Sequence, residues 1–347
     1  MDFSLFYFAD SSSDPDDAYR LLLEGAKFAD AHGFSAVWTP ERHFHSFGGL
    51  YPNPAVTSAA IATVTSHISI RAGSVVAPLH HPVRIAEEWS VVDNLSHGRA
   101  GISLAPGWNN SDFVLRPDNY HQRREVLVST LDTVRRLWRG EKIALPDGDG
   151  RLTPVQIHPK PVQQELPVWI TSAGNLQTFQ LAGRLGTGVL THLLGQTLED
   201  LTDKIGVYRA AHHAHHGSSG HVAIMLHTFL GQDAESVAEI VRGPFSAYLR
   251  SSLNLITHAA RDLLPGIDPS TLDPDDLDFL VQQSFDRYFR TGGLFGSVSD
   301  GLATLDRLAE TDIDEVACLV DFVPGTDAVL GSLKYLDELK DSWSARR

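Results

Sequence analysis

The sequence predicts an α/β protein, a (β/α)8 TIM barrel of parallel strands, and three observations support this fold class. Short apolar runs alternate with longer amphipathic stretches, which is the pattern of strands joined by crossover helices. Eight such pairs follow one another along the chain. The length of 347 residues is enough for a barrel of about 250 residues together with insertions. A doubly wound open sheet is the alternative, but no GxGxxG motif follows a predicted strand, which weakens it.

The N-terminal half supplies four of the predicted strands, each followed by a helix. The strands are predicted at residues 3–8, 35–39, 68–77 and 100–104. Their helices are predicted to begin at the acidic segment 14–17, at Pro54, at Pro82 and at Tyr120. Proline suits the first turn of a helix because the N–H that it lacks would have no partner there.

The C-terminal half supplies the other four strands, at residues 168–173, 188–193, 222–230 and 316–322. Helices are predicted at 176–185, 198–213 and 328–339. Two excursions interrupt the rhythm. Residues 140–166 are rich in proline and in Asp-Gly pairs, so we expect a surface excursion with a small hairpin. Residues 233–289 are too long for one crossover helix and are predicted to form an insertion of several helices within one domain that spans residues 1–347.

The amino-acid composition argues against several classes of function. Lys and Arg number 28 against 43 Asp and Glu, a net charge of −15 that repels nucleic acids and anionic membranes. No run of 18 apolar residues and no signal peptide is present. The single cysteine, Cys318, excludes a disulfide framework and suits a reducing compartment. We therefore expect a cytoplasmic protein that binds neither nucleic acid nor membrane.

In a barrel of this kind the chemistry lies in the loops that follow the carboxyl ends of the strands. After the second strand, Glu41, Arg42 and His43 place a carboxylate, a guanidinium and an imidazole beside aromatic residues, which supplies acid and base groups for a dry pocket. The alternative is a structural ion pair between Glu41 and Arg42. We take these three residues as catalytic candidates.

The loops after the third and fourth strands offer different chemistry. His80 and His81 are adjacent, but a metal site needs three or four convergent ligands and none completes one here, so no metal is predicted. Trp108 and Asn109 follow a glycine, and the indole offers a flat wall for a planar ligand. An ordinary buried tryptophan is the alternative.

The loop after the fifth strand has the small, polar character of an anion site. Ala173, Gly174, Asn175 and Thr178 lead into a helix, whose first amide groups and positive dipole end favour a phosphate. A plain helix cap by Asn175 explains the same residues. The sequence therefore leaves both interpretations open at this turn.

Taken in order, these motifs resemble the luciferase-like monooxygenases, the flavin-dependent barrel family that includes the α subunit of bacterial luciferase. The resemblance lies in Glu-Arg-His-Phe at 41–44, Pro-Asn-Pro at 52–54, His-Pro-Val-Arg-Ile-Ala-Glu-Glu at 81–88 and Leu-Ser-His-Gly-Arg at 95–99. It continues through residues 119–124, 172–175 and 188–196 and is weakest at 233–289. Within the family the chain is most similar to a subgroup from natural-product gene clusters.

The resemblance implies FMN at the mouth of the barrel. Its phosphate would be held by Gly174, Asn175, Thr178 and Arg124, with Arg123 as the weaker candidate. A non-prolyl cis peptide, mapped to Gly73-Ser74, would lie under the flavin ring, with Thr191 and His192 near it. His192 thereby joins Glu41, Arg42 and His43 as a catalytic candidate. Trp108, Asn109 and Ala173 complete the cofactor-binding candidates that the sequence provides.

One position departs from the family. Luciferase α subunits carry a catalytic histidine directly after the glutamate, where this chain has Arg42, and His43 follows one residue later. Arginine does not release its proton near neutral pH, so the luciferase mechanism does not transfer to this position and light emission is not expected. We expect Arg42 to hold an anion and His43 to act as acid or base.

The resemblance implies an FMN-dependent monooxygenase that receives reduced flavin from a separate reductase and oxidises a small organic or carrier-tethered substrate in natural-product biosynthesis. Family members commonly dimerise, so a homodimer is expected. Two alternatives stay open. One is hydride transfer with a deazaflavin cofactor on the same barrel, and the other is a non-catalytic flavin-binding partner subunit.

Overall fold

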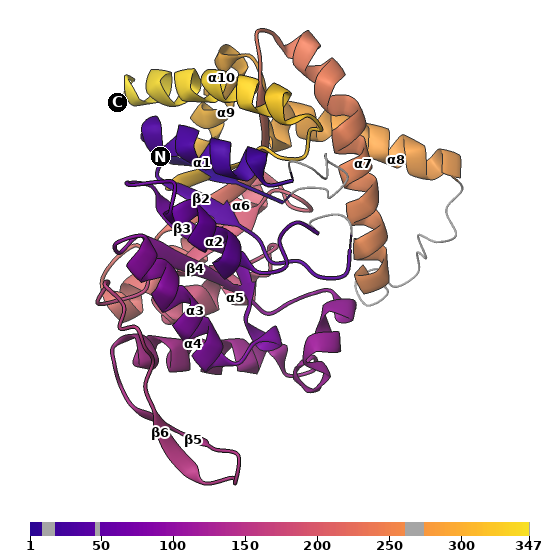
Figure 1. Cartoon of the computed structure of the whole chain (residues 1–347). Helices are drawn as coiled ribbons and strands as arrows, with labels where there is room; N and C mark the ends of the chain where they lie inside the picture. Colours follow the sequence, from indigo (N-terminus) through magenta and orange to yellow (C-terminus); the bar gives the residue numbers. More distant parts are fainter. Residues whose placement is uncertain (9–17, 46–48, 261–273, 347) are drawn as a thin grey trace.

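Eight parallel strands form a closed barrel in the computed structural model, which describes residues 1–8, 18–45, 49–260 and 274–346 (Figure 1). The strands are β1 (Asp2–Phe6), β2 (Ala36–Thr39), β3 (Ser69–Val76), β4 (Ala100–Ala105), β7 (Val168–Thr171), β8 (Gly188–His192), β9 (Val222–Leu230) and β11 (Glu315–Leu319). They pair in the order β9-β11-β1-β2-β3-β4-β7-β8, and β8 pairs again with β9, which closes the ring. The predicted (β/α)8 fold is therefore confirmed.

Helices follow the strands and surround the barrel, as predicted (Figure 1). They are α1 (Arg20–Ala31), α2 (Pro54–Ala62), α3 (Pro82–Leu95), α4 (Arg123–Trp138), α5 (Leu176–Arg184), α6 (Leu198–His216) and α10 (Thr326–Ser344). The predicted acidic helix start at 14–17 lies outside the described residues. Helix α4 begins three residues after the predicted Tyr120, because two 3-10 turns, Asn110–Leu115 and Pro117–Asn119, precede it. No helix among the described residues is long and apolar enough to span a bilayer.

Both excursions have the predicted character. Strands β5 (Ile143–Pro146) and β6 (Leu152–Val155) form an antiparallel hairpin that projects away from the barrel (Figure 1). Residues 233–289 contain all of α7 (Ala234–Ala260) and α8 (Pro274–Arg287) and the start of a π-helical turn, Tyr288–Gly292. Strand β10 (Leu294–Gly296) and helix α9 (Val298–Ala309) were not predicted from the sequence. A Ser297–Asp300 capping box was the available signal for α9.

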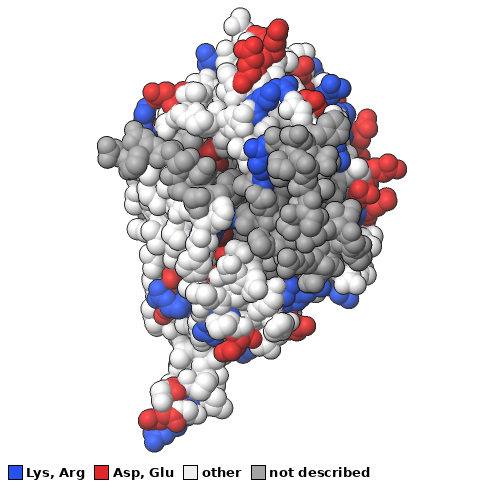
Figure 2. Space-filling view, turned by 90° about the vertical axis from the view of Figure 1, so that its right-hand side faces the viewer, with Lys and Arg blue, Asp and Glu red and all other residues white. Residues whose placement is uncertain are grey.

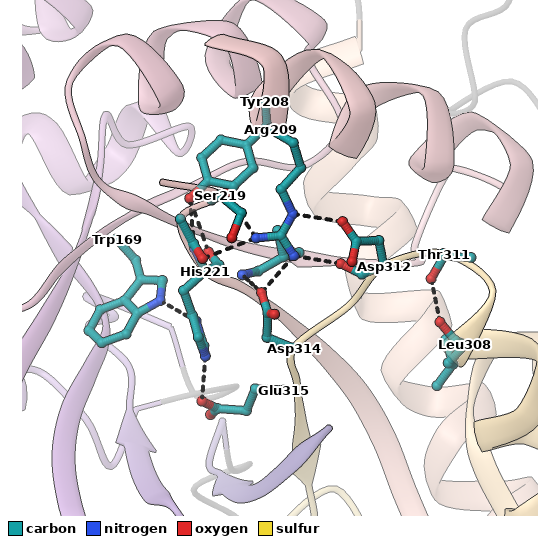
Figure 3. Close-up of polar contacts among 12 residues, drawn as sticks. Trp169, Tyr208, Arg209, Ser219, His221, Leu308, Thr311, Asp312, Asp314 and Glu315 are labelled. Carbon is teal, nitrogen blue, oxygen red and sulfur yellow. Dashed lines mark hydrogen bonds and ion pairs between the residues drawn. The ribbon is translucent and has the colours of Figure 1, made fainter. Parts of the chain in front are cut away.

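The amino-terminal end of the barrel is closed by a network around Glu315, the first residue of β11. Arg71 Nη1 donates to Glu315 Oε2 at 2.6 Å, and Ser4 and Trp38 donate to Oε1 at 2.5 and 2.8 Å. Figure 3 shows His221 between Trp169 and Glu315: the indole N–H donates to Nδ1 at 2.9 Å, and Nε2 lies 3.6 Å from Oε2. These contacts tie together the strand ends opposite the loops that carry the catalytic candidates.

Candidate active site

The catalytic candidates lie where the strands end, beside the insertion. Glu41, Arg42 and His43 follow β2, His80 follows the short 3-10 helix after β3, and Trp108 follows β4. Figure 2 views the molecule from the side on which α7 lies. On the described surface in that view, neither sign of charge gathers into a single patch.

Glu41 is the centre of a buried hydrogen-bonded cluster. Its side chain is fully buried, and Oε1 lies 2.8 Å from His43 Nε2 and 2.6 Å from His80 Nε2. The backbone N–H of Val76 donates to Oε2 at 2.7 Å. The carboxylate therefore pairs with two histidines, and the alternative of a structural pair with Arg42 is wrong.

Two pKa shifts follow from this cluster. Burial alone would raise the pKa of the Glu41 carboxyl, but hydrogen bonds from His43 and His80 bring it below its ordinary value. Burial alone would lower the pKa of His80, and the hydrogen bond and charge of Glu41 raise it above its ordinary value. The ionised carboxylate thus favours a protonated imidazole at His80.

Arg42 is buried between aromatic rings. Its guanidinium carbon lies 5.3 Å from the ring centre of Phe8 and 5.4 Å from that of Trp108, within cation–π range. Burial lowers the pKa of Arg42, and guanidinium still remains charged at neutral pH. Trp108 is 49% exposed, so the alternative of an ordinary buried tryptophan is wrong. Asn109 accepts a hydrogen bond from Ser111 N and donates to Asp112.

The Gly73-Ser74 peptide bond is cis, as the resemblance implied. A methyl group on Gly73 would lie 2.6 Å from the ring of Phe6, so only glycine fits at this point of the barrel wall. The hydroxyl of Ser74 contacts that of Thr171, which in turn lies 2.6 Å from the hydroxyl of Ser103. Three hydroxyl groups from neighbouring strands therefore lie together.

Thr191 and His192 end β8 and are held by Gln196, which the sequence analysis did not select. Gln196 Nε2 donates to Thr191 Oγ1 at 3.2 Å and to the His192 carbonyl at 2.5 Å. His192 Nδ1 accepts from Leu194 N at 3.1 Å. Burial lowers the pKa of His192 to about 4, so its imidazole is neutral at pH 7.

The turn after β7 confirms the helix-cap interpretation, and the phosphate site stays a prediction. The side chain of Asn175 caps α5, accepting from Gln177 N at 2.9 Å and Thr178 N at 3.2 Å. Gly174 has a φ of +114°, and a methyl group there would lie 3.3 Å from Lys204 Nζ. Lys204, which was not predicted from the sequence, donates to Gln196 Oε1 at 2.8 Å and so holds its ammonium beside this turn.

The remaining phosphate candidates lie at or near the protein surface. Arg124 is exposed in the first turn of α4, and Ala173 is exposed beside Gly174, whereas Thr178 is half-buried. Glycine backbone, helix N-terminus and lysine ammonium are donors that suit an anion, so the residues present fit a phosphate group.

A second missed residue, His227 in β9, is buried against aromatic rings. Its ring centre lies 4.7 Å from Phe245 and 4.2 Å from Tyr248, both on α7, and 5.3 Å from Phe322. Burial lowers the pKa of His227 to about 3, and its Nε2 has no hydrogen-bond partner among the described residues. The insertion thus packs directly on the carboxyl-terminal half of a barrel strand.

In the part of the chain that the structure describes, no three His, Cys, Asp or Glu side chains converge as metal ligands. The family model described as luciferase-like monooxygenase matches residues 1–274. The chain belongs to this family. The match covers the barrel from β1 through β9 together with α7.

Curated relatives are distant. An uncharacterized protein of Mycobacterium tuberculosis is 28% identical over 48% of this chain and 65% of its own length, so the match spans less than two thirds of that relative. The oxygenase component of the flavin-dependent trigonelline monooxygenase of Acinetobacter baylyi is 25% identical over 72% of this chain and 70% of that protein.

Solved structures share the fold over nearly the whole chain. Monooxygenase RslO1 from Streptomyces bottropensis has a TM-score of 0.78 and 21% identity, covering 97% of this chain and 98% of that one. The oxygenating constituent of 3,6-diketocamphane monooxygenase of Pseudomonas putida, in complex with FMN, has a TM-score of 0.74 and 17% identity, covering 97% of each. An F420-dependent secondary alcohol dehydrogenase has a TM-score of 0.70 and 17% identity, also covering 97% of each chain.

Proposed function

We propose that this chain is the oxygenase component of an FMN-dependent monooxygenase, which uses reduced flavin and oxygen to oxidise a small organic or carrier-bound substrate. The observation that carries the proposal is the buried Glu41–His43–His80 cluster beside Arg42, in a barrel of the luciferase-like family. A carboxylate with two imidazoles handles protons, and a guanidinium between aromatic rings holds an anion in a site that excludes water.

The residues at the carboxyl-terminal end of the barrel fit FMN. Gly174, Asn175, Thr178 and Arg124 would hold its phosphate, and the wall for its ring would come from Gly73, Ser74, Trp108, Asn109, Ala173 and Thr191. When bound, the reduced flavin supplies the two electrons that activate oxygen. The supporting observation is the donor set at the Gly174 turn, where Lys204 lies beside the glycine.

Each catalytic candidate has its own role. His43 gives or takes a proton at the mouth, and Glu41 fixes the orientation of its ring through the 2.8 Å contact at Nε2. Arg42 stabilises negative charge without exchanging protons. His192 is neutral, so it serves as a hydrogen-bond partner near the flavin ring rather than as a proton donor.

The relatives support the remaining parts of the proposal. The trigonelline enzyme is named an oxygenase component, which favours a separate reductase here as the source of reduced flavin. A role in natural-product biosynthesis rests on the sequence resemblance alone. The contacts of Phe245 and Tyr248 on α7 with His227 support a role for the insertion in substrate selection. We propose a homodimer as the assembly.

Flavin titration with oxygen uptake tests the proposal. The purified protein is expected to bind FMN and, with a flavin reductase present, to consume oxygen and incorporate one oxygen atom into substrate. If turnover transfers hydride and needs no oxygen, the deazaflavin alternative, which the F420-dependent neighbour favours, replaces the monooxygenase. A purified homomer that turns over alone eliminates the non-catalytic partner subunit.

A further inference from the structure

We infer that His80, Glu41 and His43 form a proton path from solvent to the mouth of the barrel, with His80 as its outer member. The inference rests on the proposed function, which requires protons at that mouth, and it assigns a role to a histidine outside the catalytic set above. His80 does not belong to the Glu-Arg-His-Phe run, and it reaches the site from a different strand.

The exposed fractions of the three side chains indicate which end of the path faces solvent. The His80 side chain is 23% exposed, that of Glu41 is 0% and that of His43 is 11%. A fully buried carboxylate therefore separates the more exposed imidazole from the less exposed one. The two rings are brought together only by the fold, because 36 residues lie between them in the sequence.

The hydrogen bonds give the path its continuity. Both rings meet the same oxygen, Oε1, through Nε2, at 2.6 Å from His80 and 2.8 Å from His43. Transfer proceeds from the tautomer in which His43 carries its hydrogen on Nδ1 and its Nε2 is unprotonated. His80 Nε2–H then gives its proton to Oε1, and the same oxygen passes that proton to His43 Nε2 without rotation of the carboxylate. The N–H of Val76 on Oε2 holds the carboxylate in this orientation. Uptake of a proton at His80 Nδ1 is then balanced by release at His43 Nδ1.

The proposed reaction consumes one such proton. The reduced flavin anion, oxygen, substrate and one proton give oxidised flavin, oxygenated substrate and water. One oxygen atom goes to the substrate and the other, with the two hydrogens, to water. Without substrate, the same proton is consumed as hydrogen peroxide forms. A site that excludes water needs a defined route for this proton.

Nearby charges favour proton entry at His80. Glu88, on α3, acts on His80 and attracts a proton to it, while Asp112, in the 3-10 turn after β4, lies near both Arg42 and His43. Arg42 carries the fixed positive charge of this region. Acidic groups thus lie near both ends of the path and attract a proton. Of the charges named here, only Arg42 repels it.

The test uses reduced FMN and oxygen as probes, so no substrate needs to be identified. We expect His80→Ala to slow the reoxidation of protein-bound reduced FMN about tenfold or more, because acid–base groups contribute about 10² to 10⁴ in rate. Added imidazole is expected to restore most of the rate by replacing the missing ring, and FMN affinity is expected to stay within a factor of two. His80→Gln keeps a donor for Glu41 but carries no proton, so it should be equally slow.

His67→Ala is the matched control, because His67 is an exposed histidine whose Nδ1 lies 3.6 Å from Asp30 at the opposite end of β3, and its rate should equal that of the unaltered protein. A wild-type rate in either His80 variant overturns the path, and so does slowing that imidazole does not restore. If the unaltered protein neither binds FMN nor reacts with oxygen, the proposed function fails instead. The path is then tested in the cofactor-free protein, where His80→Gln must change the pH dependence of the His43 ring resonances in NMR spectra; unchanged resonances overturn it.

Discussion

The two ends of the barrel each bury one glutamate, and the charged groups closest to the two carboxylates differ in kind. Glu315 contacts a guanidinium, with the His221 imidazole farther away at 3.6 Å, whereas Glu41 contacts two imidazoles. At the amino-terminal end, Glu315 lies 2.6 Å from the guanidinium of Arg71 (Figure 3 shows the adjoining contacts of His221). At the mouth, Glu41 lies within 2.8 Å of two imidazoles. Burial alone would raise the pKa of Glu315, and the charge of Arg71 lowers it below its ordinary value.

The partners of the two glutamates differ in whether they can exchange a proton near neutral pH. A guanidinium holds its proton at any pH near neutrality, so the Arg71–Glu315 pair keeps fixed charges and can only brace the strand ends. Imidazole gains and loses a proton near pH 7, so the cluster at Glu41 can change its charge state during a reaction. We therefore assign Glu315 a role in stability and propose a role in proton transfer for Glu41, according to the partner of each carboxylate.

The largest expected effect on stability is at the amino-terminal end. Arg71→Met leaves Glu315 buried without its countercharge, and removal of one partner of a buried ion pair costs about 3 to 5 kcal/mol. Urea unfolding measures this loss. Arg84→Met is the matched control, because Arg84 is 63% exposed in its pair with Glu88 and exposed pairs contribute about 0 to 1 kcal/mol. Equal losses of unfolding free energy in Arg71→Met and Arg84→Met would contradict the claim that the buried pair contributes more stability than the exposed pair.

The largest expected effect on activity is at the mouth. Glu41→Gln keeps the shape of the side chain but removes the proton acceptor between His43 and His80. We expect the rate of substrate oxidation to fall about 10²-fold, in line with loss of an acid–base group, while FMN affinity is unchanged. Steady-state oxygen uptake and a flavin titration measure the two quantities. A variant that loses FMN affinity and keeps its rate would contradict the assignment.

The Glu41–His80 pair is expected to make the stability of the protein depend on pH. The raised pKa of His80 adds stability that is fully present below about pH 6.5 and disappears as pH rises through the folded-state pKa. The lowered pKa of Glu41 adds stability that is present above about pH 4.5 and disappears as pH falls. The destabilisation by Glu41→Gln should therefore be larger at pH 5.5 than at pH 9, as thermal unfolding can measure. A constant difference would show that the pair does not titrate.

The smallest expected effect concerns the phosphate turn. Lys204→Met is expected to weaken FMN binding about fivefold, within the range of one charge-assisted hydrogen bond. Riboflavin lacks the phosphate, so its affinity should be unchanged in the variant. Fluorescence titration of both ligands gives the two constants. Equal weakening of both would place Lys204 outside the phosphate site.

The sequence predicts the barrel well because each strand is a short apolar run bounded by polar loops. The eight predicted strands overlap the observed ones, and the hairpin at 140–166 and the helical insertion are both present. Strand β10 was missed because Leu294–Gly296 is three residues long and shows no period. Helix α9 was overlooked although Ser297 and Asp300 signal its start.

The candidate site could be predicted only in part. Glu41 and His43 are two residues apart in the sequence, so the sequence alone could place them in one site. The contact of Glu41 with His80 spans 39 positions and depends on the pairing of β2 with β3. The place of Lys204 beside Gly174 depends in the same way on the packing of α6 near the turn after β7. The pattern also suggested a pair of Glu41 with Arg42, and the fold instead places the arginine between two aromatic rings.

The most direct test of the account is an NMR titration of the histidine rings in the cofactor-free protein, with and without Glu41→Gln. If Glu41 joins the two rings through one oxygen, His43 and His80 will change protonation in linked steps in the unaltered protein. They will titrate independently in Glu41→Gln, while His67 stays the same in both. Independent titration of His43 and His80 in the unaltered protein, with no change on substitution of Glu41, would contradict the account.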